Sequence, residues 1–241
     1  MAKIFRYELK RMLLNKFFLC LLVVNGISAW FELSTQIVAG VAFTAPFSVW
    51  SFGAYLAGVM PMAIMTALFL LSIYYSRNER QVEALTLATP VDRAKYMLLR
   101  NMAVSLGFLV ICIIAIAQCV VFYGVIFDFW RVGGFILPAM LTILPGFVLF
   151  MGLGRWAGGI RPWLLYVLIP VSLGLSLAGL PGVLDFFGGW YFNNYPLELP
   201  AYADGEPGFV YSAVFLVTRG AYLVVGGALW VISLRPARGA Q

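Results

Sequence analysis

The sequence predicts an all-α membrane protein with six transmembrane helices, an N-terminal amphipathic helix at the membrane interface and a short cytoplasmic helix between the second and third spans. Hydrophobic residues make up 63% of the 241 residues and charged residues 11%, whereas soluble domains carry about 25% charge. Apolar windows of about 18 residues or more recur along the chain, and each could cross a hydrocarbon core of about 30 Å. Because lipid offers the backbone no hydrogen bonds, such windows must be helical. The sequence contains no apparent internal repeat or low-complexity tract, so residues 1–241 are predicted to form a single transmembrane domain.

Six apolar runs qualify as spans. The first is diluted by Asn25, Gly26 and Glu32, and the second, fourth and fifth contain prolines, which commonly kink a helix. The predicted spans cover residues 17–36, 50–75, 97–126, 132–153, 161–181 and 212–234.

The basic residues predict the orientation of these spans. With the N-terminus in the cytoplasm, the cytoplasmic segments hold 14 of the 16 Lys and Arg residues, as the positive-inside rule requires. Both termini are therefore expected in the cytoplasm. The net charge of +6 then reflects membrane sidedness and needs no nucleic-acid partner. The cytoplasmic segments are residues 1–16, 76–100, 154–161 and 235–241, and the acids expected outside are Glu32, Asp128, Asp185, Glu198, Asp204 and Glu206.

Residues 2–15 have the spacing of an amphipathic helix. Apolar side chains recur at i, i+4, i+7 and i+8, and basic side chains occupy another face. This pattern favours a helix in the headgroup region, held by apolar burial and by anionic membrane lipids. A solvated basic leader is the alternative.

Residues 76–100 form a charged segment between two long apolar runs. Ser76 and Glu79 have the spacing of a capping box, and Thr89-Pro90-Val91-Asp92 gives a second one with proline at the first helical position. These two signals predict a short helix over about 77–88, parallel to the membrane on its cytoplasmic side.

Two features near the opposite face are open to more than one interpretation. The segment 182–211 lacks Lys and Arg and is rich in aromatic residues, which indicates either a re-entrant hairpin or an ordered outer loop. Arg219 lies inside the last apolar run, where an unpaired charge costs a few kcal/mol. It is either an interfacial anchor or a functional charge that pairs with an external acid or contacts substrate.

Several kinds of chemistry are not expected of this chain. It has no G-x-x-x-x-G-K-[ST] loop and no lysine after Lys95, so it lacks a conventional nucleotide-binding domain. It has no histidine, the commonest general base. The three cysteines fit small apolar packing residues better than a disulfide framework. Neither catalytic residues nor a metal site is predicted.

Two stretches carry a resemblance to a known family. They are FRYELKRMLLNKFFL, which begins at Phe5, and NERQVEALTLATPVDRAKYMLLRN, which begins at Asn78. With six spans around them, they resemble the ABC-2 type permease family, the membrane subunits of bacterial ABC transporters. The resemblance implies a protein of the bacterial cytoplasmic membrane that has no cofactor of its own. A separate ATPase subunit would bind ATP and Mg, and a second permease copy or a sister permease would complete the transporter.

In such permeases the loop between the second and third spans is a coupling helix that docks on the ATPase. The resemblance therefore implies ATPase-coupling roles for a set of residues in this loop and in the short cytoplasmic loop at 154–161. They are Asn78, Glu79, Arg80, Glu83, Thr86, Leu87, Thr89, Pro90, Arg155 and Arg161.

The family also implies a translocation path lined by the second and fifth spans. Apolar side chains and small hydroxyls on these spans favour an exported cargo that is amphipathic or lipophilic, such as a peptide, a drug or a lipid-like molecule. Residues expected along the path are Met60, Met62, Met65, Thr66, Ser172, Ser176 and Arg219.

Two other functions compete with an ATP-driven exporter. A secondary transporter usually places carboxylates or histidines within its spans, and the expected absence of such groups from the core spans counts against it. A non-transporting immunity or sensor component is the other alternative. Recovery of an ATPase subunit with the chain would separate these functions.

Overall fold

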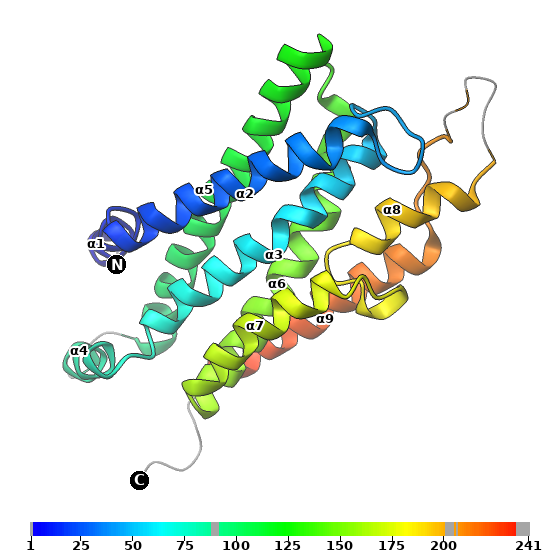
Figure 1. Ribbon diagram of the computed structural model, residues 1–241. Coiled ribbons are helices and arrows are strands. Elements are labelled where there is room, and N and C mark those ends of the chain that lie inside the picture. The colour runs from blue at the N-terminus through cyan, green and yellow to red at the C-terminus, as the bar shows by residue number, and fades with distance from the viewer. Residues whose placement is uncertain (1, 88–91, 201–204, 206, 235–241) are drawn as a thin grey trace.

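A computed structural model of the chain describes residues 2–87, 92–200, 205 and 207–234. Across these residues every regular element is helical, which confirms the predicted all-α class (Figure 1). In chain order the elements are α1 (Ala2–Leu13), α2 (Lys16–Thr35), η1 (Ile37–Ala39), α3 (Val49–Ile73), α4 (Arg77–Leu87), α5 (Arg93–Phe127), η2 (Gly133–Phe135), α6 (Ile136–Ile160), α7 (Trp163–Leu177), η3 (Gly182–Leu184), α8 (Gly189–Glu198) and α9 (Ala213–Leu234).

In the part of the chain that the structure describes, five helices are long and apolar enough to cross a membrane, as in a multi-pass membrane protein. They are α2, α3, α5, α6 and α9, and they coincide with the first four predicted spans and the last. The longest is α5, at 35 residues, or about 52 Å at 1.5 Å per residue. It therefore exceeds the hydrocarbon thickness of about 30 Å and extends beyond it.

The fifth predicted span differs from the expectation. Instead of a crossing helix over 161–181, the described chain forms α7, which has only 15 residues and is about 22 Å long. Gly179 and Gly182 adopt positive φ angles of 55° and 66° on either side of Pro181, and proline has no backbone donor. These residues end the helix early. The apolar composition continues beyond Leu177, but the helix ends at that residue.

Part of the 182–211 segment folds back into the bundle as α8. This helix packs against α3, and Phe192 is fully buried there. A Cβ atom on Gly53 of α3 would lie 2.2 Å from the Phe192 ring, so only glycine allows this approach. The sequence left a re-entrant hairpin and an ordered outer loop as the two interpretations of this segment, and its described part contains a helix that packs on the bundle.

Helix α3 is the centre of the bundle. It packs against α2, α5, α6, α7 and α8, and 72% of its most apolar window is buried, compared with 22% for α2 and for α9. Protein therefore surrounds α3, whereas α2 and α9 turn most of their apolar side chains outward, as helices that face lipid do.

Helices α6 and α9 approach most closely at two glycines. A Cβ atom on Gly152 would lie 2.2 Å from the carbonyl oxygen of Gly226, and one on Gly226 would lie 2.5 Å from the carbonyl oxygen of Val148. Small residues at such positions let helix backbones touch, which is the main source of packing energy between helices in lipid.

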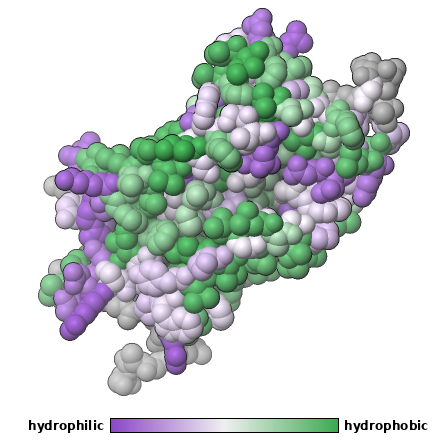
Figure 2. Space-filling model, in the orientation of Figure 1, coloured by the Kyte–Doolittle hydropathy of each residue, from purple (hydrophilic) through white to green (hydrophobic). Residues whose placement is uncertain are grey.

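Helices α1 and α4 and the junction of α6 with α7 lie at one end of the bundle, and α8 lies toward the other (Figure 1). Hydrophilic side chains gather at the end that carries α1 and α4, and apolar surface dominates the middle (Figure 2). The predicted N-terminal helix is present as α1. It packs against α5, and its buried face includes Glu8 and Met12.

Candidate functional site: a charged cluster joining α1, α4 and α5

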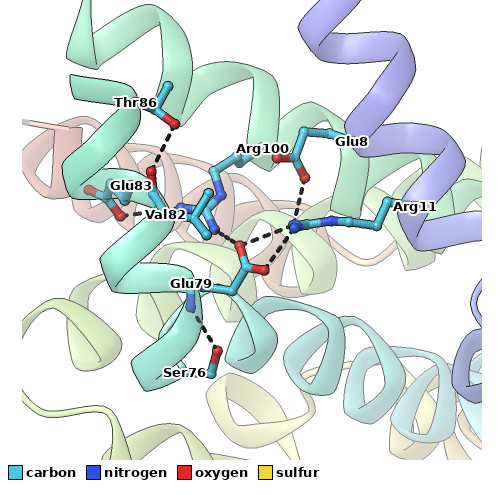
Figure 3. Close-up of polar contacts among 8 residues, drawn as sticks. All are labelled: Glu8, Arg11, Ser76, Glu79, Val82, Glu83, Thr86 and Arg100. Atoms are coloured by element: carbon cyan, nitrogen blue, oxygen red, sulfur yellow. Dashed lines mark hydrogen bonds and ion pairs between the residues drawn. The ribbon is translucent and has the colours of Figure 1, made fainter. Parts of the chain in front are cut away.

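Five charged side chains from three helices meet at this hydrophilic end (Figure 3). We call them the charged cluster. It comprises Glu8 and Arg11 of α1, Glu79 and Glu83 of α4, and Arg100 of α5. Three carboxylates therefore face two guanidinium groups.

Glu79 is at the centre of the cluster. Arg11 donates to both of its carboxylate oxygens, from Nη1 to Oε1 at 2.7 Å and from Nη2 to Oε2 at 3.1 Å. Arg100 Nη2 donates to Glu79 Oε2 at 2.6 Å. Charge-assisted bonds of this kind are roughly twice as strong as neutral ones, and the bidentate geometry fixes orientation as well. One α4 carboxylate therefore connects α1 to α5.

Arg100 is the buried cation of the cluster. Its side chain is 1% exposed, compared with 14% for Glu79 and 15% for Glu83. Nη1 donates to Glu83 Oε2 at 3.2 Å, and the guanidinium group lies 4.1 Å from the Tyr74 ring centroid and 5.3 Å from that of Tyr96. A buried charge is stable only when it is paired and well bonded, so α4 must stay in place to satisfy Arg100.

Arg11 connects the cluster to its own helix. Its Nη2 atom also donates to Glu8 Oε2 at 2.9 Å, one helical turn away. Burial lowers the pKa of Arg11, but the hydrogen bond to Glu79 and the negative charges of Glu8 and Glu79 outweigh this effect and raise it above its ordinary value. These interactions therefore favour the charged guanidinium group.

Local sequence explains how α4 presents its acids. The Ser76 hydroxyl accepts a hydrogen bond from the backbone N–H of Glu79 at 3.4 Å, which is one half of the predicted capping box. The Glu79 carboxylate turns instead toward the two arginines. Glu79 and Glu83 are four residues apart and so share one face of α4.

The opposite face of α4 is exposed and mixed in character. It carries two apolar side chains, Val82 at 45% and Leu85 at 74% exposure, among exposed polar ones. The polar members are Arg77, Asn78 and Gln81.

The predicted ATPase-coupling residues are distributed over both faces. Asn78 lies on the exposed face, whereas Glu79 and Glu83 point into the charged cluster. Thr86 is half-buried, and its hydroxyl donates to the Val82 carbonyl at 2.8 Å. The side chains of Arg80 and Leu87, and all of Thr89 and Pro90, lie outside the described residues.

The start of α5 also differs from the second predicted capping box. The described helix begins at Arg93, and Asp92 caps it by accepting a hydrogen bond from the Ala94 N–H at 2.9 Å. In the predicted cytoplasmic loop at 154–161, whose two arginines were assigned ATPase-coupling roles, Arg161 is exposed, but Arg155 is only 4% exposed. The Arg155 carbonyl accepts a bond from the Tyr75 hydroxyl at 3.2 Å.

Sequence reasoning missed the residues that complete the cluster, namely Glu8, Arg11 and Arg100. The available signal was Glu8, an acid on the same helical face as Phe5 and Met12, where an apolar residue would be expected. Its partner is Arg11, three residues later, but nothing in the sequence indicates that Arg11 also pairs with Glu79, 68 residues away.

Residues of the predicted translocation path do not share one surface. A cleft of about 480 Å³ lies between α2, α3, α7 and α8, and its lining includes Met62 and Ser176. Met60, Thr66 and Ser172 are buried in the bundle instead, and Met65 is half-buried.

The two buried hydroxyls on this list already have partners. Thr66 Oγ1 accepts from Asn25 Nδ2 at 2.8 Å and donates to the Met62 carbonyl at 3.0 Å. Ser172 Oγ donates to the Ile169 carbonyl at 2.8 Å. Both hydroxyls therefore serve helix packing in this conformation.

Arg219 is fully buried, so it does not act as an anchor at the lipid interface. Its guanidinium group donates to the backbone carbonyls of Asp185, at 3.0 Å, and of Phe186. The Asp185 carboxylate in turn accepts from the N–H groups of Gly188 and Tyr191, both at 2.9 Å. Arg219 of α9 therefore holds the turn that leads into α8, and this turn is the partner that the sequence left undefined.

The chain has no match to a protein-family model, to a curated protein or to a solved structure. Functional inference therefore depends on the sequence and on the geometry described above.

Proposed function

We propose that this chain is the permease subunit of an ATP-driven ABC transporter. It would export an amphipathic or lipophilic molecule across the bacterial cytoplasmic membrane, with both termini in the cytoplasm. The observation that carries the proposal is the anchoring of α4, a short polar helix placed between two long apolar helices and ion-paired to α1 and α5.

Anchoring of this kind suits a helix that transmits force. A partner that displaces α4 must also displace Arg100 of α5 and Arg11 of α1, because Glu79 is bonded to both. A free loop would absorb the same displacement. The charged cluster is therefore assigned to holding the coupling helix against the spans, and not to contact with the partner.

The partner would dock on the exposed face of α4. Val82 and Leu85 supply apolar area there, and Asn78 and Gln81 supply hydrogen-bonding groups at the rim. An ATPase subunit would bind ATP and Mg and close on this face. A second permease copy or a sister permease would complete the assembly, because a translocation path between two bundles needs both.

Co-purification with an ATPase subunit tests the proposal. The tagged chain is expressed with the neighbouring reading frames of its operon, and recovery of an ATPase subunit is measured together with its ATP hydrolysis. Leu85→Asp should abolish recovery, because it places a charge on the docking face. Lys95→Asp is the matched control, since its side chain is exposed at the same end but lies off that face. Failure to recover any ATPase with the wild-type chain would refute the proposal.

One observation favours a secondary transporter as a second candidate. Glu32, expected outside the membrane, lies within α2, and its carboxylate borders the cleft between α2, α3, α7 and α8. Carboxylates within spans are typical of transporters driven by ion gradients. Transport in sealed vesicles distinguishes the candidates, because a secondary transporter works without ATP and stops when the proton gradient is collapsed.

A further inference from the structure

The cleft that contains Glu32 has the size and position of a small-molecule site. Its volume is about 480 Å³, within the range of roughly 300–1,000 Å³ that such sites occupy. Residues of α2, α3, α7 and α8 line it. Glu32 lies 16 residues after Lys16, so it is about 24 Å along α2 at 1.5 Å per residue. The cleft is therefore nearer the α8 end of the bundle than the charged cluster. Hydrophilic colour interrupts the apolar surface between α2 and α8 in Figure 2.

Negative charge dominates this cleft. Among the described residues that line it, the charged ones are Glu32 and Asp185. The Asp185 carboxylate is already occupied by the N–H groups of Gly188 and Tyr191. From the described residues, Glu32 accepts only a long bond from the Gln36 side chain, at 3.4 Å. Glu32 is thus the carboxylate that retains capacity for a ligand.

Gly58 of α3 makes room for the Glu32 carboxylate. A Cβ atom at this position would lie 2.4 Å from Glu32 Oε1 and 2.7 Å from Cδ. The acid therefore reaches across the interface between α2 and α3 into the cleft, and it does so only because residue 58 has no side chain. This packing orients the carboxylate before any ligand arrives.

Other groups around the cleft favour a cation. The carboxyl-terminal end of α7 borders it through Ser176 and Leu177, and the last carbonyl groups of a helix carry partial negative charge. Trp190 and Phe186 contribute aromatic walls, and the faces of aromatic rings attract cations. Asn193 donates one amide N–H to the Gly189 carbonyl at 2.7 Å, and its side-chain oxygen is a hydrogen-bond acceptor.

We propose that the cleft binds a lipophilic cation, such as an amine or onium group on an apolar body, with Glu32 as its counter-ion. This inference rests on the proposed transport function only where it identifies the bound cation as the class of cargo. Binding itself can be measured without an ATPase, so the two proposals can fail separately.

The test uses the full chain in nanodiscs of uncharged lipid. The probe is radiolabelled tetraphenylphosphonium, and tetraphenylborate serves as an anion of the same shape. Binding is measured by equilibrium dialysis, with empty nanodiscs subtracted. The chain should bind the cation in preference to the anion. Glu32→Gln should weaken cation binding by at least fivefold, since it removes the Coulomb attraction between the cation and its counter-ion. Glu198→Gln, at an exposed acid of α8 outside the cleft, should leave binding unchanged.

A second variant separates loss of the carboxylate from loss of the fold. Gly58→Ala keeps Glu32 but forces its carboxylate out of the position described above, and it too should weaken cation binding. Thermal unfolding of each variant verifies its fold. A change of less than fivefold in the Glu32→Gln variant, or equal binding of the anion, overturns the inference. Specific cation binding without recovery of an ATPase would uphold the inference and refute the ATP-driven function.

Discussion

Removal of the Glu79 carboxylate should release α4 from the bundle. In a Glu79→Ala variant, Arg100 keeps Glu83 at 3.2 Å and its two tyrosine rings, but it loses its shortest bond, at 2.6 Å. Arg11 keeps Glu8 at 2.9 Å. The variant therefore disconnects α1 from α4 and weakens the connection of α4 to α5.

The size of the effect follows from the exposure of each partner. Complete loss of the only partner of a buried charge costs about 3–5 kcal/mol, and because Glu83 remains, the Arg100 share should be about 2 kcal/mol. The side chain of Arg11 is 33% exposed, so solvent screening limits its share to about 1 kcal/mol or less. Together these shares lower the free energy of local opening of α4 by about 2–3 kcal/mol, which corresponds to a roughly 30- to 150-fold rise in the open population.

Hydrogen exchange measured by mass spectrometry tests this reasoning. Amide exchange in peptides from α4 should accelerate by that factor, while peptides from α9 should exchange as in the wild type. Gln81→Ala is the matched control, because it changes the exposed face of the same helix and leaves the ion pairs intact. Exchange of α4 within threefold of the wild type in the Glu79→Ala variant would refute the view that the charged cluster holds α4 in place.

Three further predictions concern the rest of the bundle. Gly226→Val should abolish recovery of monodisperse protein in size-exclusion chromatography, because a Cβ atom there would lie 2.5 Å from the α6 backbone. Gly227→Ala should be tolerated, because the space around its Cβ position is open. Arg219→Met should increase amide exchange in α8 by at least tenfold, because the guanidinium group donates to two carbonyls of the preceding turn; unchanged exchange would disprove this role. Burial raises the pKa of Asp185, although three backbone N–H groups and the Arg219 charge oppose the shift. A raised pKa means that the folded state binds the proton more tightly, so protection of α8 should fall as pH increases from the unfolded pKa of about 4 through the higher folded value, and Asp185→Asn should remove this dependence.

The membrane-spanning helices were largely predictable because they depend on composition. Apolar runs identify α2, α3, α5, α6 and α9 without reference to partners, and Ser76 marks the start of α4 within the predicted boundaries. The residue at which a helix ends was harder to predict from the sequence. Gly179 and Gly182 lie at the end of an apolar run, where hydropathy continues, but their positive φ angles end the helix.

The charged cluster and the cleft could not be predicted, because each depends on distant residues. Arg11 and Glu79 are 68 positions apart, and each is an ordinary charged residue of a polar segment, so nothing near either one marks it as a member of the pair. Glu32 was expected on the external side because it lies near the end of the predicted span 17–36, and it is found in the last turn of α2, which ends at Thr35. Its carboxylate reaches the cleft only because Gly58, on another helix, leaves space.

The contact between Gly152 and Gly226 has a mechanical consequence. Where two main chains touch, neither can slide along the other unless they first separate, so α6 and α9 should travel as one body. Arg219 adds the turn before α8 to that body. A large change in the shape of this protein is then expected outside this body, and the cleft that α2 and α7 flank is one boundary where hinge motion should be sought.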